Sequence, residues 1–290
     1  MKKTNSALTM NESVEQVKSR LKFKTSVMVL VIAFLVLVTA TLAWFTLSGM
    51  AGVSTLDMSV TTGTELEISI DGSNWGKTLT PTQINAYMTA NGYGTTLDNM
   101  RLQPVSTWDN TSAQVLSYED RSEVTTDSAK STGAYLYIPI WIRSSTDSKV
   151  FLSAAKFEDT TTGTVLDNGT QINADNTKNG GNAALNEVYK TVRFSLTPAS
   201  ASAAAICYEE EADTLIGGSN PANLVTHAGL GTKSGIDNPA AAQVATVTAN
   251  TPVQFWLRVW IDGNSAECTN AVRSAAFQVA IAFDSEEIAA

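Results

Sequence analysis

The sequence is poor in the residues that enzymes most often use for chemistry. Its single histidine, His227, excludes a zinc site built from several histidines, and no H-E-x-x-H pair occurs. A G-x-S-x-G elbow, a Walker A loop and a dinucleotide-binding glycine fingerprint are also missing. His227 lies in the polar stretch NLVTHAGLG, where we expect a solvent-exposed residue and not a ligand. We therefore predict a protein that is not an enzyme and needs no cofactor or metal ion.

Charged residues are scarce as well, at 16% of the 290 residues, and they are unevenly placed. The first 43 residues hold six of the 19 basic residues and two of the 28 acidic ones. This leaves 13 basic and 26 acidic residues from residue 44 onward, a net charge of −13. Since a body of this charge is repelled by the phosphate backbone, we expect no binding to nucleic acid. The Thr/Ser-rich composition is typical of extracellular β proteins.

Cysteine is nearly absent, with only Cys207 and Cys268. In an exported chain such a pair is compatible with one disulfide, which would stabilise the fold by about 4 kcal/mol if unstrained. Two buried free thiols fit the sequence equally well.

The nearby acidic run at 209–211, in CYEEEADT, lacks the spacing of a calcium loop, so we interpret it as a solvated acidic turn.

One long uncharged run stands near the N-terminus, at residues 26–45 (SVMVLVIAFLVLVTATLAWF). Twenty apolar or small residues can cross a bilayer as a helix, so the run predicts membrane contact before any cleavage. Basic residues precede the run, and Asp57 is the first charge after it. By the positive-inside rule, residues 1–24 form a cytoplasmic basic arm and residues 44–290 an exported domain.

Residues 25–43 are then a signal peptide or a membrane anchor. Ala43 and Thr41 are small at the two positions that a signal peptidase reads, which favours a cut before Trp44. Cleavage would place the protein in the medium or on the cell surface. An uncleaved helix would leave it anchored in the membrane.

Beyond the spacer SGMAG, hydrophobic residues alternate with a period of two, the pattern of β-strands. In STLDMSV, the residues Leu56, Met58 and Val60 share one face. An apolar strand at a freed N-terminus can add itself to the sheet of another chain, which makes this segment the candidate donor strand. The same alternation predicts further strands in TELEISIDGSNW, GAYLYIPIWIRSS, KVFLSAAKF, YKTVRFSLTP, TPVQFWLRVWIDG and AAFQVAIAFD. Pro139 lacks an N–H, so its strand must lie at an edge or turn this position away from a neighbour.

Residues 253–262 are the clearest strand, with the even-numbered side chains facing outward. Trp256 and Trp260 therefore become candidate surface aromatics that could stack on sugar rings. We favour the alternative that a loop or a neighbouring subunit covers them.

A single short helix is expected after Thr80, which can cap it, with Pro81 at its first position and Asn91-Gly92 at its end. The stretches 158–186 and 211–250 are predicted to be long loops. Together these elements predict an all-β fold, an antiparallel β-sandwich with one short helix and long loops, preceded by one N-terminal hydrophobic helix.

Several short motifs resemble the TasA/camelysin-type secreted proteins of Gram-positive bacteria. The first is a long hydrophobic signal ending in LAWF and followed by STLDMSV. The sequence is also similar to a broader group of exported Firmicutes proteins in four further motifs, LEISIDGSNW, LQPVST, YIPIWIRSS and FWLRVWIDGNSAECTNA. The resemblance implies a jelly-roll subunit of a cell-surface or biofilm matrix, whose N-terminal strand completes the sheet of the next subunit in a fibre. Camelysin carries a metallopeptidase label, which we do not transfer because the histidines of a zinc site are missing.

The expected function is thus a non-enzymatic, exported structural subunit that associates with itself through its N-terminal strand. An adhesin or glycan-binding module that uses Trp256 and Trp260 is the main alternative. A secreted glycoside hydrolase that needs only two carboxylates is a third, although no spacing singles out a pair.

Overall fold

The computed structural model divides the chain into two compact units, Met1–Ser48 and Gly49–Ala290. In the first unit the described residues are helical and exposed, and no described helix is long and apolar enough to cross a membrane. Most of the predicted arm and of the predicted signal or anchor, with Ala43 and Trp44, lies outside the described residues. The structure describes residues 22, 24, 26–32, 51–60, 65–105, 116–117, 122–154, 169–200, 205–213, 215, 223–231, 239–269, 272 and 274–289.

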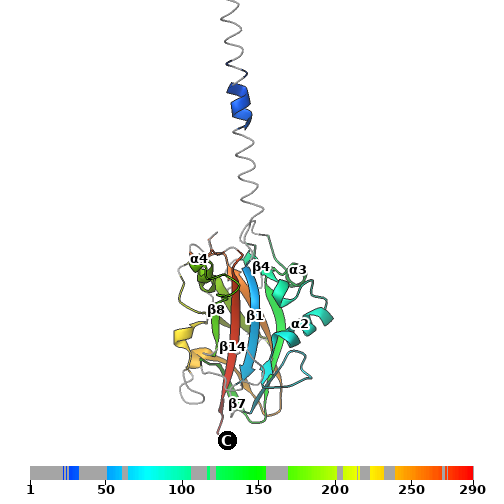
Figure 1. The fold of residues 1–290 in the computed structure, drawn as a ribbon. Coiled ribbons are helices and arrows are strands. Elements are labelled where there is room, and N and C mark those ends of the chain that lie inside the picture. Colours follow the sequence, from blue (N-terminus) through cyan, green and yellow to red (C-terminus); the bar gives the residue numbers. More distant parts are fainter. Residues whose placement is uncertain are drawn as a thin grey trace, which may run out of the picture. The chain divides into compact units, whose positions relative to one another are not determined.

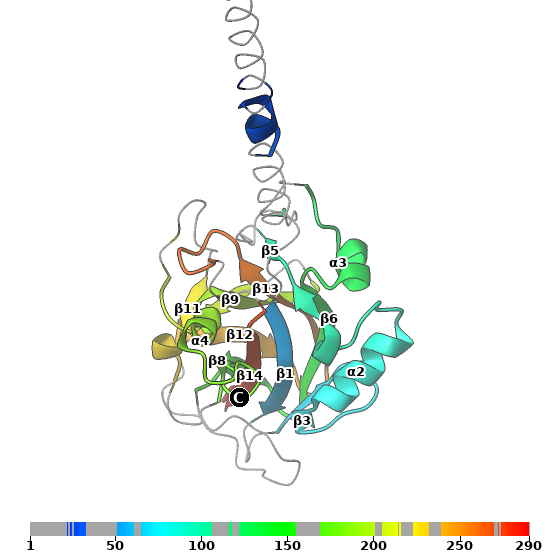
Figure 2. The ribbon, with the colours of Figure 1, turned by 45° about the horizontal axis from the view of Figure 1, so that its top comes forward.

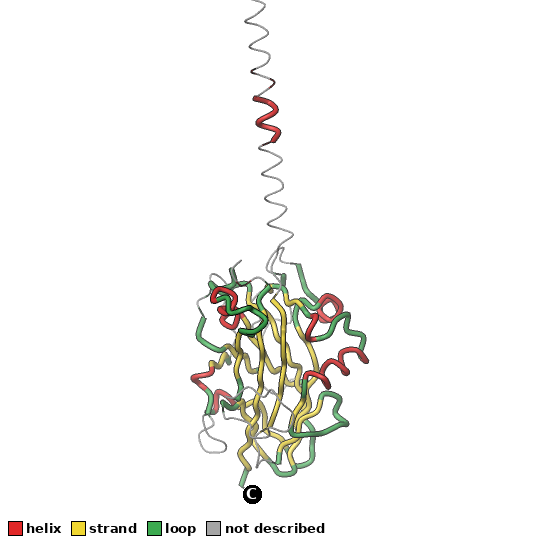
Figure 3. The backbone as a smooth tube through the Cα atoms, viewed as in Figure 1, coloured by secondary structure: helices red, strands yellow, loops and turns green. Residues whose placement is uncertain are grey.

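The second unit consists mostly of strands in two sheets, as the alternating pattern predicts (Figures 1 and 3). We call them sheet A and sheet B. The strands of sheet A, in spatial order, are β12 (Gln243–Val247), β7 (Ser148–Leu152), β14 (Ala276–Glu287), β1 (Ala51–Val60) and β3 (Thr78–Leu79). Two more strands join it, β8 (Gln171–Ala174) on β14 and β4 (Arg101–Leu102) on β1.

Sheet B lies against the other side of the core. Its strands, in spatial order, are β11 (Leu224–Thr226), β10 (Ile206–Glu209), β9 (Val192–Pro198), β13 (Val253–Asp262), β6 (Leu136–Ser144) and β2 (Leu66–Ser69). The short β5 (Pro104–Val105) pairs with β13.

The all-β prediction with two sheets is confirmed, but both sheets are mixed, so the prediction of an antiparallel sandwich holds only for part of the strand pairs. Among the described strands, β1 runs parallel to β14, β10 to β11 and β5 to β13. The alternation of side chains along a strand does not depend on the direction of its neighbour, so the pattern could not have revealed this.

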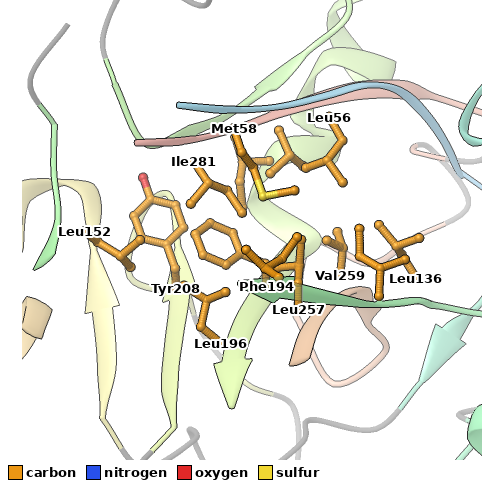
Figure 4. Packing of buried hydrophobic residues seen from close by; sticks show 14 of the residues in the cluster. Leu56, Met58, Leu136, Leu152, Phe194, Leu196, Tyr208, Leu257, Val259 and Ile281 are labelled. Atoms are coloured by element: carbon orange, nitrogen blue, oxygen red, sulfur yellow. The ribbon is translucent and has the colours of Figure 1, made fainter. Parts of the chain in front are cut away.

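The space between the sheets is filled by the side chains that the alternation assigns to the inner face. Leu56, Met58 and Val60 from β1 are at most 1% exposed, and Phe255, Leu257 and Val259 from β13 are fully buried. Figure 4 shows Leu56, Met58 and Ile281 from sheet A packing toward Phe194, Leu257 and Val259 from sheet B. The candidate strand is thus part of the core of the second unit.

Pro139 lies at a position where its missing N–H costs the sheet no ladder hydrogen bond. Strand β6 runs between β13 and β2, but β2 pairs only with Trp141–Ser144. Pro139 is therefore beyond the end of β2, and the prediction for this residue is confirmed.

The predicted helix is present as α2 (Pro81–Ala90), capped by Thr80, and it buries Ile84 and Met88. The structure adds α3 (Thr126–Thr132), next to β6, and α4 (Ala183–Asn186) (Figure 2). It also adds the short 3-10 helices η1 (Leu97–Asn99), η3 (Glu187–Thr191), η4 (His227–Gly229) and η5 (Ala240–Ala242).

The expected loops also contain three short strands, β8 within 158–186 and β11 and β12 within 211–250. The prediction of one helix and two long loops is therefore too simple. The additional elements are short, and most have too few apolar residues to show a period.

The burial of β1 predicts how much its core face stabilises the protein. Replacing Leu56 with Ala should lower the free energy of unfolding by about 2–5 kcal/mol, because the side chain is fully buried. The matched Thr55→Ala variant, at a half-buried position next to it, should cost about 1 kcal/mol or less. Urea unfolding followed by tryptophan fluorescence measures both, and equal losses would contradict the packing described here.

Candidate functional site

The N-terminal strand β1 is the first candidate site, and β14 is its main partner. The two strands run parallel from Gly52 opposite Ala276 to Val60 opposite Phe283 (Figure 1). In this register Leu56 lies opposite Val279 and Met58 opposite Ile281. The ladder is interrupted by a bulge between Val53 and Thr55.

Near this bulge, the Ser54 hydroxyl donates a hydrogen bond of 2.9 Å to the carbonyl of Phe277. The Gly52 N–H donates to the carbonyl of Ala275 at 2.8 Å. These bonds fix the start of β1 against the start of β14.

The opposite edge of β1 is held by much shorter pairings. Strand β4 pairs with Ala51 and Gly52, and β3 pairs with Met58 and Ser59. The 3-10 helix η1 also packs against β1. Among the described strands, β14 therefore supplies the only ladder that follows β1 along its length.

One ionisable side chain, Asp57, lies in the middle of β1. It faces away from Leu56 and Met58 and is half-buried. Its Oδ2 atom is buried and has no hydrogen-bond partner among the described residues. Burial raises the pKa of Asp57 from 3.8 to about 6.

The outer face of sheet B is the second candidate site, because polar and aromatic side chains are aligned across four strands. One cross-strand row contains Cys207, Ser195, Arg258 and Tyr137, which lie opposite one another on β10, β9, β13 and β6. The next row contains Glu209, Arg193 and Trp260, on β10, β9 and β13. Register thus brings together residues that are far apart in the sequence.

An ion-pair cluster at one end of this face is almost completely shielded from solvent. The Arg193 guanidinium lies 2.7 Å from Glu209 Oε2 and 2.7 Å from Asp262 Oδ2, and all three side chains are at most 1% exposed. Burial raises the pKa of Glu209, and the charge of Arg193 counteracts this shift. Arg193 pairs with both carboxylates, so the cluster depends on this residue.

Trp260 is also fully buried, so it is not a surface aromatic, and the favoured alternative that something covers this position is the one that the structure bears out. It belongs to a small cluster with Tyr135, Cys207, Val105 of β5 and Ala129 of α3. Alternation correctly assigned Trp260 to the outer face, but it could not show that other parts of the same chain cover that face.

Trp256 remains half-buried, and one face of its ring is already occupied. It stacks on Tyr137 with ring centroids 4.8 Å apart and an interplanar angle of 7°. The Arg258 guanidinium follows at 5.2 Å from the Tyr137 ring and 5.1 Å from the Tyr135 ring. The two-tryptophan platform that a glycan-binding module would need is therefore not formed.

The two cysteines are free thiols, so the candidate disulfide is not formed. Cys207 is fully buried in the small outer cluster, whereas Cys268 packs against the main core. Burial raises the pKa of Cys207 well above its usual range and that of Cys268 to about 12. Both thiols are thus protonated at neutral pH and behave as small apolar groups.

The interpretation of residues 209–211 as a solvated acidic turn is correct only for Glu211. Glu209 belongs to the ion-pair cluster, and Glu210 links the two sheets. The Glu210 carboxylate accepts hydrogen bonds from the Ile172 N–H of β8 at 2.7 Å and from the Tyr208 hydroxyl at 2.8 Å. The run breaks up in this way because Glu209 is the last residue of β10, whereas Glu210 and Glu211 lie in the bend that follows it.

His227 belongs to the same link and is half-buried, which corrects the expectation of an exposed residue. Its Nδ1–H donates to the carbonyl of Thr170 at 2.9 Å, and Nδ1 lies 3.6 Å from Glu210. No sequence motif signals this contact, because its members come from three separate segments. Among the described residues, no group of three or more His, Cys, Asp and Glu side chains could hold a metal ion.

Comparisons with protein-family models, with curated proteins and with solved structures find no match to this chain.

The ion-pair cluster predicts unequal roles for two arginines. Arg193→Ala should lower the free energy of unfolding by about 3–5 kcal/mol, because it leaves the carboxylates of Glu209 and Asp262 buried and unbalanced. Arg143 is the matched control, since its ion pair with Glu67 at 2.6 Å is about one-third exposed. Arg143→Ala should cost at most about 1 kcal/mol. Urea unfolding compares the two, and an equally mild Arg193→Ala variant would refute the prediction.

Proposed function

We propose that this protein is a non-enzymatic structural subunit, exported to the cell surface or extracellular matrix, that assembles with copies of itself through β1. The proposal includes a jelly-roll-like topology for the two-sheet body and removal of the N-terminal segment by a signal peptidase before Trp44. It rests above all on the position of β1, which is the first strand of the body and contributes core residues from the N-terminal end of the chain.

The way in which β1 is held supports exchange between subunits. Its core face packs between the sheets, but its backbone follows one long neighbour, β14, and two two-residue strands. A strand of this kind can leave its own sheet and enter the same position in another copy. All core contacts are then regained, because the receiving groove is identical.

Export provides the reason for such an arrangement. The uncharged run at 26–45 ends only a few residues before Ala51, where β1 begins. While the run is held in the membrane, β1 is tethered at its N-terminal end. Cleavage before Trp44 would give β1 a short free arm, and the strand could then pair with a neighbouring subunit.

A disulfide lock tests whether β1 must leave its own sheet. Ser59 and Ala282 are paired across β1 and β14, and both face away from the core. A Ser59→Cys/Ala282→Cys variant, with both native cysteines replaced by Ala, should remain monomeric when oxidised, because β1 cannot separate from β14. Adding a reductant should restore filaments in negative-stain electron microscopy. Filaments of the locked form would refute assembly through β1.

A mixing experiment asks where β1 goes. Subunits carrying only Ser59→Cys are assembled with subunits carrying only Ala282→Cys and then oxidised. A disulfide-linked dimer on a non-reducing gel is expected, because β1 of one subunit lies beside β14 of the next. Mixing Ser59→Cys with Thr246→Cys, an exposed position on β12, is the control and should give no dimer. A dimer in the control but not in the test would exclude the proposed pairing.

A further inference from the structure

Asp57 is an unusual residue for the centre of a strand that packs onto a core. It stands between Leu56 and Met58 and opposite Ala280 of β14. The buried Oδ2 atom has no hydrogen-bond partner in the described part of the chain. An ionised carboxylate in such a position loses hydration without regaining it from the protein.

No charged group on the elements around β1 compensates for this loss, since burial is the one cause of the shift in the pKa of Asp57. Helix α2 and strand β3 carry no charge at all. The other elements that pack against β1 carry these charged residues: Asp98 in η1, Arg101 in β4, Glu67 in β2, and Asp284, Glu286 and Glu287 in β14. Lys77 lies just before β3.

The two nearby cations, Arg101 and Lys77, donate hydrogen bonds to backbone carbonyls and not to Asp57. The Arg101 guanidinium donates to the carbonyls of Met100 at 2.8 Å and Asp98 at 3.3 Å. The Lys77 ammonium donates to the carbonyl of Leu66 at 2.6 Å. The Asp57 carboxylate is therefore partly desolvated, and no cation of the described residues pairs with it.

We propose that Asp57 makes the attachment of β1 to its sheet pH-sensitive, so that the ionised carboxylate loosens β1 and the protonated carboxyl holds it in place. The role of this switch in controlling strand exchange between subunits rests on the proposed function. The local effect on β1 does not, because it follows from the burial of Asp57 within one chain.

The direction of the effect follows from the pKa. In the folded protein Asp57 has a pKa of about 6, above the value of 3.8 of an unperturbed Asp. The folded state therefore binds the proton more tightly than a state with β1 detached. The penalty on β1 is present in full above pH 6 and disappears as the pH falls from about 6 to below 4. Acid should thus slow the exchange of β1, and neutral pH should permit it.

Hydrogen–deuterium exchange on the full chain tests this directly. Protection factors of peptides from β1 are measured at pH 5 and pH 7.5, after correction for the intrinsic exchange rate at each pH, with β13 as an internal reference. The protection of β1 relative to β13 should be about tenfold higher at pH 5, as a pKa of about 6 requires. A ratio that does not change with pH would overturn the proposal.

Two variants separate Asp57 from other titrating groups. Asp57→Asn has the same shape but no charge, so its β1 should be equally protected at both pH values. Asp98→Asn removes the same charge from an exposed position in the adjacent η1 and should keep the wild-type pH dependence. A pH dependence that persists in Asp57→Asn would assign the effect to another group and overturn the proposal.

The experiment also distinguishes the switch from the proposed function. If β1 shows the expected pH dependence but the protein never forms filaments, the switch stands and assembly through β1 fails. If filaments form but the protection of β1 is insensitive to pH, assembly stands and the switch fails.

Discussion

The parallel pairing of β1 with β14 is the contact on which the rest of this structure depends. It joins the start of the folded unit to its last strand, and it places Leu56, Met58 and Val60 between the two sheets. On its other side, β14 pairs with β7 and β8. Without β1, this central strand would expose one edge, and the core of sheet A would lose a row of side chains. Forming the contact brings together segments more than 200 residues apart in the sequence, at a considerable cost in entropy.

In the proposed assembly, this contact would let one strand both stabilise the monomer and join subunits. A strand from another copy satisfies the groove beside β14 as well as the chain's own strand does. The choice between the two then depends on how readily β1 detaches and on whether its N-terminal end is free. Under the proposal, Asp57 bears on the first condition through its half-buried carboxylate, and the proposed cleavage before Trp44 would bear on the second.

The outer face of sheet B is partly covered by the chain itself. Trp260 packs under α3 and β5, and Arg193 holds two buried carboxylates beside it. Such a cluster is costly to assemble, but it specifies one register for β10, β9 and β13, since a shift of one residue would separate the charges. Half-buried Trp256 and Tyr137 continue this face beyond the covered region. The covering also explains why an outward-facing tryptophan did not become a surface residue.

Local patterning by itself determined the positions of most long strands, their inner faces and helix α2, because these depend on residues one to four positions apart. The alternation in β1 and β13 and the cap at Thr80 are signals of this kind. The tertiary structure alone decided which strands pair, in which direction, and what covers each face. The hydrogen bond from Ser54 to Phe277 spans 223 residues, and no local pattern encodes a partner at such a distance. The same is true of the free cysteines, the Glu210–His227 link and the Asp57 carboxylate, whose surroundings come from segments far apart in the chain.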